Sequence, residues 1–254
     1  MMIRHQSPYT PLTLDADSPD DRRSGHQISA TADWVAPNPS VADRMPKRFR
    51  SKGSTQGILV TTGKDPRQIF WESLGELAFL LFALARLDII DVREQQEALY
   101  RDDDGVLRRH FFDFVVTTRD GTRKAIAYKP SERVRALNFD AFLTDLAGRI
   151  SPDFADEVVL ITERDLPPAT VQNAKLLHAC RRDPPGDADE AVLAVLATIT
   201  GRISIADLRD AAGHGGEGFR ATVRLIGSGR IVMEGTGRIT DHTLVRDAQK
   251  GSVQ

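Results

Sequence analysis

Three charged side chains lie in segments that otherwise look buried, and together they could act on a phosphate. Glu76 belongs to an apolar helical stretch, residues 69–86, and shares one helix face with Glu72. Asp113 interrupts the apolar strand FFDFVV, where a lone carboxylate is costly to remove from water. Lys129 ends the partner strand of the same predicted hairpin. Two carboxylates can hold a divalent cation against a phosphate, and a lysine can balance charge or orient water. The pattern therefore predicts metal-assisted phosphodiester hydrolysis.

Each of these residues also has a purely structural interpretation. The two glutamates would line the solvated stripe of their helix, Asp113 would pair with Arg108 or Arg109, and Lys129 would be an ordinary strand-end lysine. The order and spacing of the residues leave both interpretations open.

Composition narrows the class of protein. The chain has 254 residues, which suits one large or two modest domains, and its formal net charge is −2. DNA binding would therefore need a local basic surface rather than bulk positive charge. The mean hydropathy of −0.30 and the short apolar runs argue against a membrane protein. A single cysteine, Cys180, excludes a disulfide framework and fits a reducing compartment, so we expect a cytoplasmic protein.

The chain divides into four predicted parts. Residues 1–46 are rich in Pro, Ser and Asp and are expected to form a disordered tail. Residues 47–182 are predicted to form an α/β domain, residues 188–246 a second domain, and residues 247–254 a short tail.

A basic cluster at residues 44–52 includes Arg48 and Arg50. It is either a solvated run of charge or an arm that contacts DNA phosphates.

The first domain is predicted to have a mixed sheet with helices. The expected elements are a strand at 58–60, a helix at 69–86, an extended segment at 89–92, a hairpin of strands 108–118 and 123–129, a helix at 138–148, a strand at 158–162 and a helix at 169–180.

The second domain is predicted to be a winged helix-turn-helix. Helices at 189–200, 204–212 and 217–226 precede a β-ribbon at 230–234 and 238–245, with Ser204 as a helix cap.

The third helix of this domain would read DNA. Its apolar residues would pack inward while Arg220 and Arg224 face outward, and Arg238 would flank the wing. The alternative is a winged helix that docks another protein.

Several short motifs occur in a fixed order. They are ESLGELAFLL at 72–81, IDVREQ at 90–95, FDFVV at 112–116, DG at 120–121, YKP at 128–130, LITE at 160–163 and NAKLL at 173–177. Together they resemble the TnsA family, the restriction-endonuclease-like subunits of heteromeric cut-and-paste transposases. The resemblance covers about residues 47–245, and the family's C-terminal domain is also similar to a winged helix.

The resemblance implies a function and assigns residues to it. The catalytic glutamate falls on Glu76, the metal-binding aspartate on Asp113 and the lysine on Lys129, with Mg²⁺, or Mn²⁺ in its place, held by the two acids. The implied substrate is double-stranded DNA at transposon ends, nicked at the 5′ ends of the element. The implied partners are an integrase-type transposase subunit and an AAA+ ATPase regulator.

One position departs from the family pattern. The family usually has Gln two residues before the lysine, and related nucleases have Glu, but this chain has Ala127, whose methyl group cannot coordinate a metal. Backbone carbonyls at the strand end could still do so. The alternative functions are a non-catalytic DNA-binding or assembly subunit with a decayed nuclease site, and a stand-alone restriction or repair nuclease.

Overall fold

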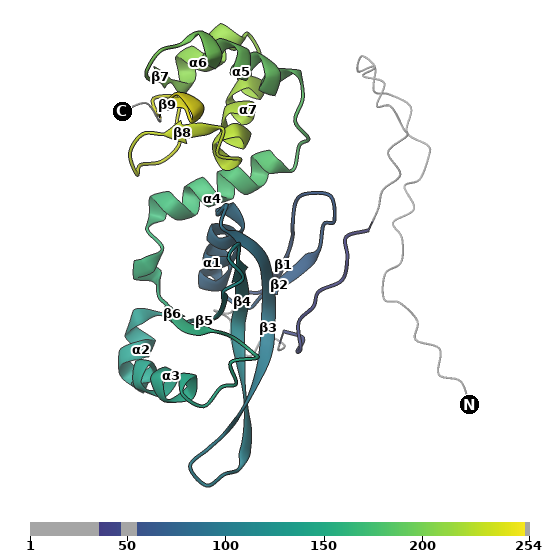
Figure 1. The fold of residues 1–254 in the computed structure, drawn as a ribbon, viewed down its shortest axis with the longest axis vertical. Helices are drawn as coiled ribbons and strands as arrows, with labels where there is room; N and C mark the ends of the chain where they lie inside the picture. The colour runs from purple at the N-terminus through teal and green to yellow at the C-terminus, as the bar shows by residue number, and fades with distance from the viewer. Residues whose placement is uncertain (1–35, 47–54, 252–254) are drawn as a thin grey trace, which may run out of the picture. The chain divides into compact units, whose positions relative to one another are not determined.

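A mixed four-stranded sheet organises the first half of the chain in the computed structural model, which describes residues 36–46 and 55–251 (Figure 1). Its strands, in spatial order, are β3 (Ile89–Arg101), β4 (Leu107–Thr118), β5 (Arg123–Tyr128) and β6 (Glu157–Ile161). The first three are antiparallel neighbours, and β6 runs parallel to β5. The predicted hairpin is confirmed as β4 and β5, whereas the extended segment expected at 89–92 is the start of the much longer β3. The fold is mixed α/β, as the sequence predicts.

Helix α1 (Leu74–Ala85) packs on one face of this sheet. It begins at Ser73, whose hydroxyl oxygen accepts a hydrogen bond from the Glu76 backbone N–H at 3.1 Å. The expected helix start at residue 69 is wrong, because Gln68–Trp71 forms strand β2, which pairs antiparallel with β1 (Gly57–Val60). The aromatic and β-branched residues of this segment suit a strand, and the Ser73 cap fixes where the helix begins.

Two further helices, α2 (Ser131–Leu137) and α3 (Phe139–Ala147), follow β5. Leu143 and Leu146 of α3 pack with Phe112, Val115 and Ala127 in a second apolar cluster of the sheet. The sequence did not predict α2, because none of its residues is buried and it therefore lacks an apolar period.

The remaining elements form a set of helices with a small sheet. They are the 3₁₀ turn η1 (Glu163–Asp165), α4 (Pro168–Arg181), α5 (Asp187–Thr198), β7 (Ile203–Ser204), α6 (Ile205–Ala212), α7 (Gly215–Gly227), β8 (Ile231–Met233), β9 (Leu244–Asp247) and the 3₁₀ turn η2 (Gln249–Gly251). The three-stranded sheet has the order β7-β9-β8 and is antiparallel.

Two local predictions in this region have different outcomes. Ser204 caps α6 as predicted, accepting a hydrogen bond from the Asp207 N–H at 3.1 Å. The strand expected at 238–245 begins only at Leu244, because the Thr243 hydroxyl bonds the Thr240 N–H and turns the chain before it.

Helix α4 runs between α1 and α7 (Figure 1) and contributes side chains to two apolar clusters. Ala174 packs with α1 and the sheet, whereas Cys180 packs with α5, α6 and α7. The described residues from Pro37 onward form one compact unit by their contacts. The predicted division between 47–182 and 188–246 stays a prediction.

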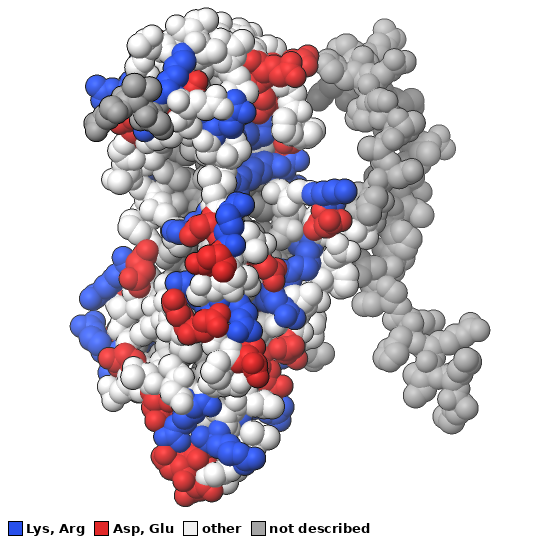
Figure 2. Space-filling view, viewed as in Figure 1, with Lys and Arg blue, Asp and Glu red and all other residues white. Residues whose placement is uncertain are grey.

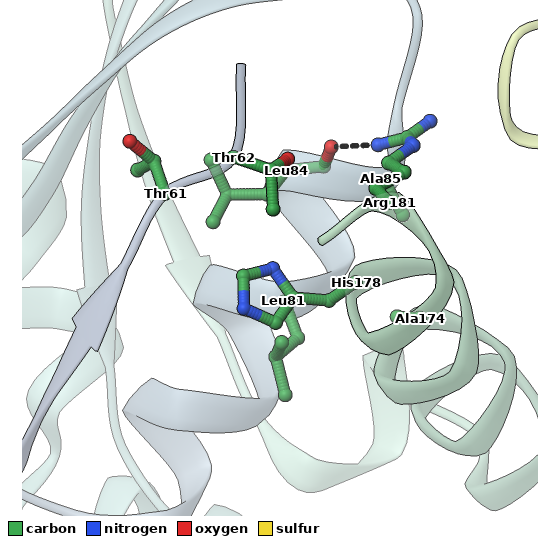
Figure 3. Close-up of a pocket in the computed structure, with 8 residues that line it drawn as sticks. All are labelled: Thr61, Thr62, Leu81, Leu84, Ala85, Ala174, His178 and Arg181. Atoms are coloured by element: carbon green, nitrogen blue, oxygen red, sulfur yellow. Dashed lines mark hydrogen bonds between the residues drawn. The ribbon is translucent and has the colours of Figure 1, made fainter. Parts of the chain in front are cut away.

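Arg181 links α1 to α7 through main-chain carbonyls. Its guanidinium donates to the Leu84 carbonyl at 2.7 Å and to the Gly227 carbonyl. Burial lowers the Arg181 pKa. The side chain borders a cavity of about 170 Å³ between α1 and α4, and Figure 3 shows the His178 ring beside the same space. Among the helices that the structure describes, none is long and apolar enough to cross a bilayer.

Substitution Arg181→Met should destabilise the protein, because two carbonyls that it satisfies lose their donor. We expect a loss of about 1–3 kcal/mol in the free energy of unfolding, measured by urea denaturation. Arg182→Met is the matched control, since Arg182 is exposed and should change stability little. Equal losses in the two variants would remove Arg181 as a structural link.

Candidate active site

The Asp113 carboxylate lies where the ladder between β4 and β5 is interrupted. The last regular pair is Phe114 with Ile126, and beyond it the Tyr128 N–H donates to Asp113 Oδ2 at 2.6 Å. A side chain thus replaces a main-chain acceptor at this point. The residues on either side, Phe112 and Phe114, are fully buried, while Asp113 itself is half-buried.

The charges around Asp113 come from several elements. Burial, followed by repulsion from Glu76, raises the Asp113 pKa to about 7. The Tyr128 hydrogen bond and the cations Lys129 and Arg44 lower the pKa by less. The charges of Glu76 and Lys129 therefore both act on Asp113, and a pKa of about 7 leaves Asp113 partly protonated near neutral pH.

Glu76 is buried, with 7% of its surface exposed, so the solvated-stripe interpretation is wrong for this residue. Its Oε2 accepts from the Glu72 N–H at 2.7 Å and its Oε1 from the Ser73 hydroxyl at 2.9 Å. Burial raises the Glu76 pKa, and these two hydrogen bonds oppose the rise. Glu72 instead pairs with Arg44 at 2.7 Å. The helix cap thus holds the Glu76 carboxylate in one position while each oxygen keeps a second lone pair.

Lys129 follows β5 and lies against an aromatic ring. Its Nζ is 4.5 Å from the centre of the Phe139 ring, and it forms no ion pair among the residues described. Its charge also acts on His110, whose pKa is lowered first by burial and then by Lys129 and Arg44. An ammonium beside a ring but without a carboxylate partner is available to an added anion.

The alternative pairing of Asp113 with neighbouring arginines is wrong. Arg108 pairs with Asp102 at 2.7 Å, and Arg109 approaches Glu97 at 3.4 Å. Both arginines precede Asp113 on β4 and pair with other acids, so neither forms an ion pair with Asp113.

The donor atoms suit a hard cation but do not form a complete cage. Residues 36–46 and 55–251 contain no group of three or more His, Cys, Asp or Glu residues that could by themselves hold a metal ion. Mg²⁺ commonly uses one or two carboxylates, several waters and substrate phosphates, so Glu76 and Asp113 fit this kind of site. Ala127 is buried in the cluster with Phe112 and contributes no donor atom from its side chain.

Sequence reasoning missed two features of the site. Arg44 was assigned to a basic cluster, but it pairs with Glu72 and its guanidinium lies 5.1 Å from the Phe111 ring centre. Gly75 allows α1 to approach β5, because a Cβ there would lie 2.0 Å from the Tyr128 ring. Neither contact has a local signal, since each joins segments far apart in the sequence.

The predicted DNA-binding arginines have different environments. Arg48 and Arg50 lie outside the described residues. Arg220 is held by Asp183, with Nε–Oδ2 at 2.9 Å, and by the Ala179 carbonyl. Arg238 is exposed between β8 and β9.

The expectation that Arg224 faces solvent is wrong. Only 8% of its side chain is exposed, and it makes two hydrogen bonds with the buried Asp189, at 2.6 and 3.1 Å. The physical reason is that α7 contacts α4, α5 and α6, which cover the face expected to enter a DNA groove. On the surface shown in Figure 2, acidic and basic side chains are interspersed, and neither sign forms an extended patch.

Comparison with models of known protein families finds no match, and no curated protein matches the chain either. The TnsA resemblance accordingly stays a prediction carried by the motifs in the sequence.

Replacing Asp113 with Asn should change how stability depends on pH. A folded-state pKa near 7, above the ordinary 3.8, means that the folded protein binds the proton more tightly than the unfolded chain. The wild type therefore loses stability as the pH rises from about 4 to about 7, and Asp113→Asn does not incur this loss. We expect the variant to gain on the order of 1–3 kcal/mol relative to wild type between pH 5 and pH 8 in urea unfolding.

Asp120→Asn is the control for this measurement. The Asp120 pKa is lowered to about 2, chiefly by hydrogen bonds from Thr118 and Thr122. The contribution of Asp120 to the free energy of unfolding is therefore constant between pH 5 and pH 8. The unfolding free energy of Asp120→Asn should differ from that of wild type by the same amount at both pH values. If the difference in unfolding free energy between Asp113→Asn and wild type were also the same at pH 5 and pH 8, that result would contradict the raised Asp113 pKa.

Arg224→Met should destabilise the protein strongly, because it leaves the Asp189 carboxylate buried without its cation. We expect a loss of about 3–5 kcal/mol, largely recovered in the double variant Arg224→Met/Asp189→Leu. Arg238→Met, at an exposed position, should change stability by less than about 0.5 kcal/mol. A fully stable Arg224→Met protein that had lost only DNA affinity would restore the original DNA-reading role.

Proposed function

We propose that this chain is a Mg²⁺-dependent DNA endonuclease subunit of a heteromeric transposase, with a restriction-endonuclease-like core. The single observation that supports this most is the electrostatic proximity of Asp113 to Glu76 and Lys129, which α1, β4 and the end of β5 supply. A buried carboxyl whose proton affinity a second acid raises, as Glu76 does for Asp113, is a group that a divalent cation would stabilise as the carboxylate.

Each residue has a distinct part in hydrolysis. Asp113 and Glu76 would hold Mg²⁺, which when bound activates water and offsets the charge of the scissile phosphate. The Asp113 carboxyl gives up its proton to become a ligand, because only the carboxylate binds a metal well. The Tyr128 N–H and the cap of α1 keep the two carboxylates oriented. The Lys129 ammonium, which has no carboxylate partner among the described residues, would face the phosphate and stabilise its developing charge.

The C-terminal half is proposed to be a winged helix that serves assembly more than sequence reading. Three helices followed by a small antiparallel sheet support the winged-helix assignment. Because α7 is covered by α4 and α5, phosphate contacts would come from exposed residues such as Arg238. The same half would dock the integrase-type transposase or the AAA+ regulator implied by the sequence resemblance.

A second candidate function is a non-catalytic DNA-binding or assembly subunit. It is favoured by Ala127, and by the lack of a cluster of three acidic, His or Cys residues within the part of the chain that the structure describes. Calorimetric titration with Mn²⁺ separates the two functions. Binding that disappears in Asp113→Ala supports the nuclease, and no binding even with DNA present supports the assembly subunit.

The direct test is strand-specific nicking of transposon-end DNA by the complex reconstituted with the transposase and the ATPase. Asp113→Ala should reduce nicking by at least about 100-fold, because it removes a metal ligand. Asp120→Ala, an exposed aspartate in the turn between β4 and β5, is the matched control and should nick as wild type does. Equal nicking by wild type and Asp113→Ala would exclude Asp113 from catalysis, and efficient cleavage by the chain alone would indicate a stand-alone nuclease.

A further inference from the structure

Gln95 is buried in the middle of β3 in an unusual conformation. Its φ is +49°, and Asn138 is the other non-glycine residue with a positive φ among the residues described. Its exposed surface is 0%, and neither Oε1 nor Nε2 has a hydrogen-bond partner within the described chain. Buried side-chain amides are nearly always hydrogen-bonded, so this one calls for a ligand that the protein itself does not supply.

The strand register places Gln95 directly opposite Asp113. The neighbouring pairs are Glu94 with Phe114 and Gln96 with Phe112, so the positions of Gln95 and Asp113 are opposite each other where the regular pairing is interrupted. On the other side of Asp113, one step beyond the pair of Phe114 and Ile126, β5 has Ala127, whose methyl group offers no donor atom. Gln95 thus occupies the position on β3 that is opposite Asp113, and its carboxamide carries an oxygen donor.

The surroundings fix this conformation rather than leave it loose. The Asp43 N–H donates to the Gln95 carbonyl at 3.2 Å. The Gln96 amide donates to the carbonyls of Val41 and Glu94, at 3.0 and 2.9 Å. Backbone strain that the neighbouring contacts maintain is typical of functional sites.

A second unsatisfied group lies near the same site. Arg44 Nε is buried and also lacks a hydrogen-bond partner among the described residues. Arg44 follows Asp43, which bonds Gln95, and its charge acts on both Asp113 and Glu76. Of the four buried side-chain atoms that have no hydrogen-bond partner among the described residues, three belong to Gln95 and Arg44, and the fourth, Arg224 Nη1, belongs to α7.

We propose that the carboxamide oxygen of Gln95 is a third protein ligand for the divalent cation held by Asp113 and Glu76. The inference rests on the proposed function and extends it to a residue outside the acid–lysine trio. The neutral amide adds an oxygen donor without increasing the repulsion between the two acids. The positive φ fixes the residue in the gap between two regular pairs of the ladder.

The test is calorimetric titration of the full-length chain with Mn²⁺. Gln95→Met keeps the length of the side chain and removes the oxygen, and it should weaken Mn²⁺ binding at least about tenfold. Gln95→Glu restores an oxygen donor and should bind Mn²⁺ at least as tightly as wild type. Gln96→Met is the matched control, because the neighbouring amide serves two carbonyls, and its loss should lower the unfolding temperature and leave Mn²⁺ affinity unchanged.

The unfolding temperature without metal gives a second readout. Gln95→Met removes an amide without a partner, so the metal-free variant should be at least as stable as wild type, and added Mn²⁺ should stabilise it less. Mn²⁺ affinity within twofold of wild type in Gln95→Met would overturn the inference and indicate an ordered water as the partner of the amide. If Asp113→Asn also leaves that affinity unchanged, or wild type binds no Mn²⁺, the proposed function fails as well.

Discussion

The position of one carboxylate, that of Asp113, constrains the rest of the candidate site. An acid between two buried phenylalanines is unfavourable unless its charge is compensated, and the main chain provides only the Tyr128 N–H. The second acid, Glu76, repels the charge of the Asp113 carboxylate and does not compensate it. Gly75 lets α1 come close enough to β5 to create this situation, and the Ser73 cap holds Glu76 there. A fold selected only for stability would not bring these acids together, so the arrangement favours a bound cation.

The C-terminal half is organised by buried pairing rather than by an exposed basic surface. Arg224 and Asp189 tie α7 to α5, Arg220 and Asp183 tie it to the end of α4, and Arg181 joins α1 to α7. Two arginines predicted to face DNA, Arg220 and Arg224, are thus engaged in ion pairs within the protein. These pairings favour the proposal that the C-terminal half docks a partner protein over the prediction that it reads DNA.

Local signals predicted much of this structure. The alternating apolar residues and the DG turn predicted the hairpin of β4 and β5, and Ser204 predicted the start of α6, because such information is contained within a few residues. The start of α1 was missed because apolar periodicity alone does not distinguish a short buried strand from the first turn of a helix. The burial of Arg224 and the contact of Arg44 with Glu72 could not be predicted from the sequence, for a different reason. Both depend on which distant helix or segment covers a face, and a helical period does not specify that.

Anomalous diffraction from crystals soaked in Mn²⁺ tests the central claim most directly. We expect a single strong manganese peak within coordination distance of carboxylate oxygens from both Asp113 and Glu76, in the space that Lys129 borders. A peak elsewhere, or well-ordered Asp113 and Glu76 side chains with no manganese between them at saturating Mn²⁺, would contradict it.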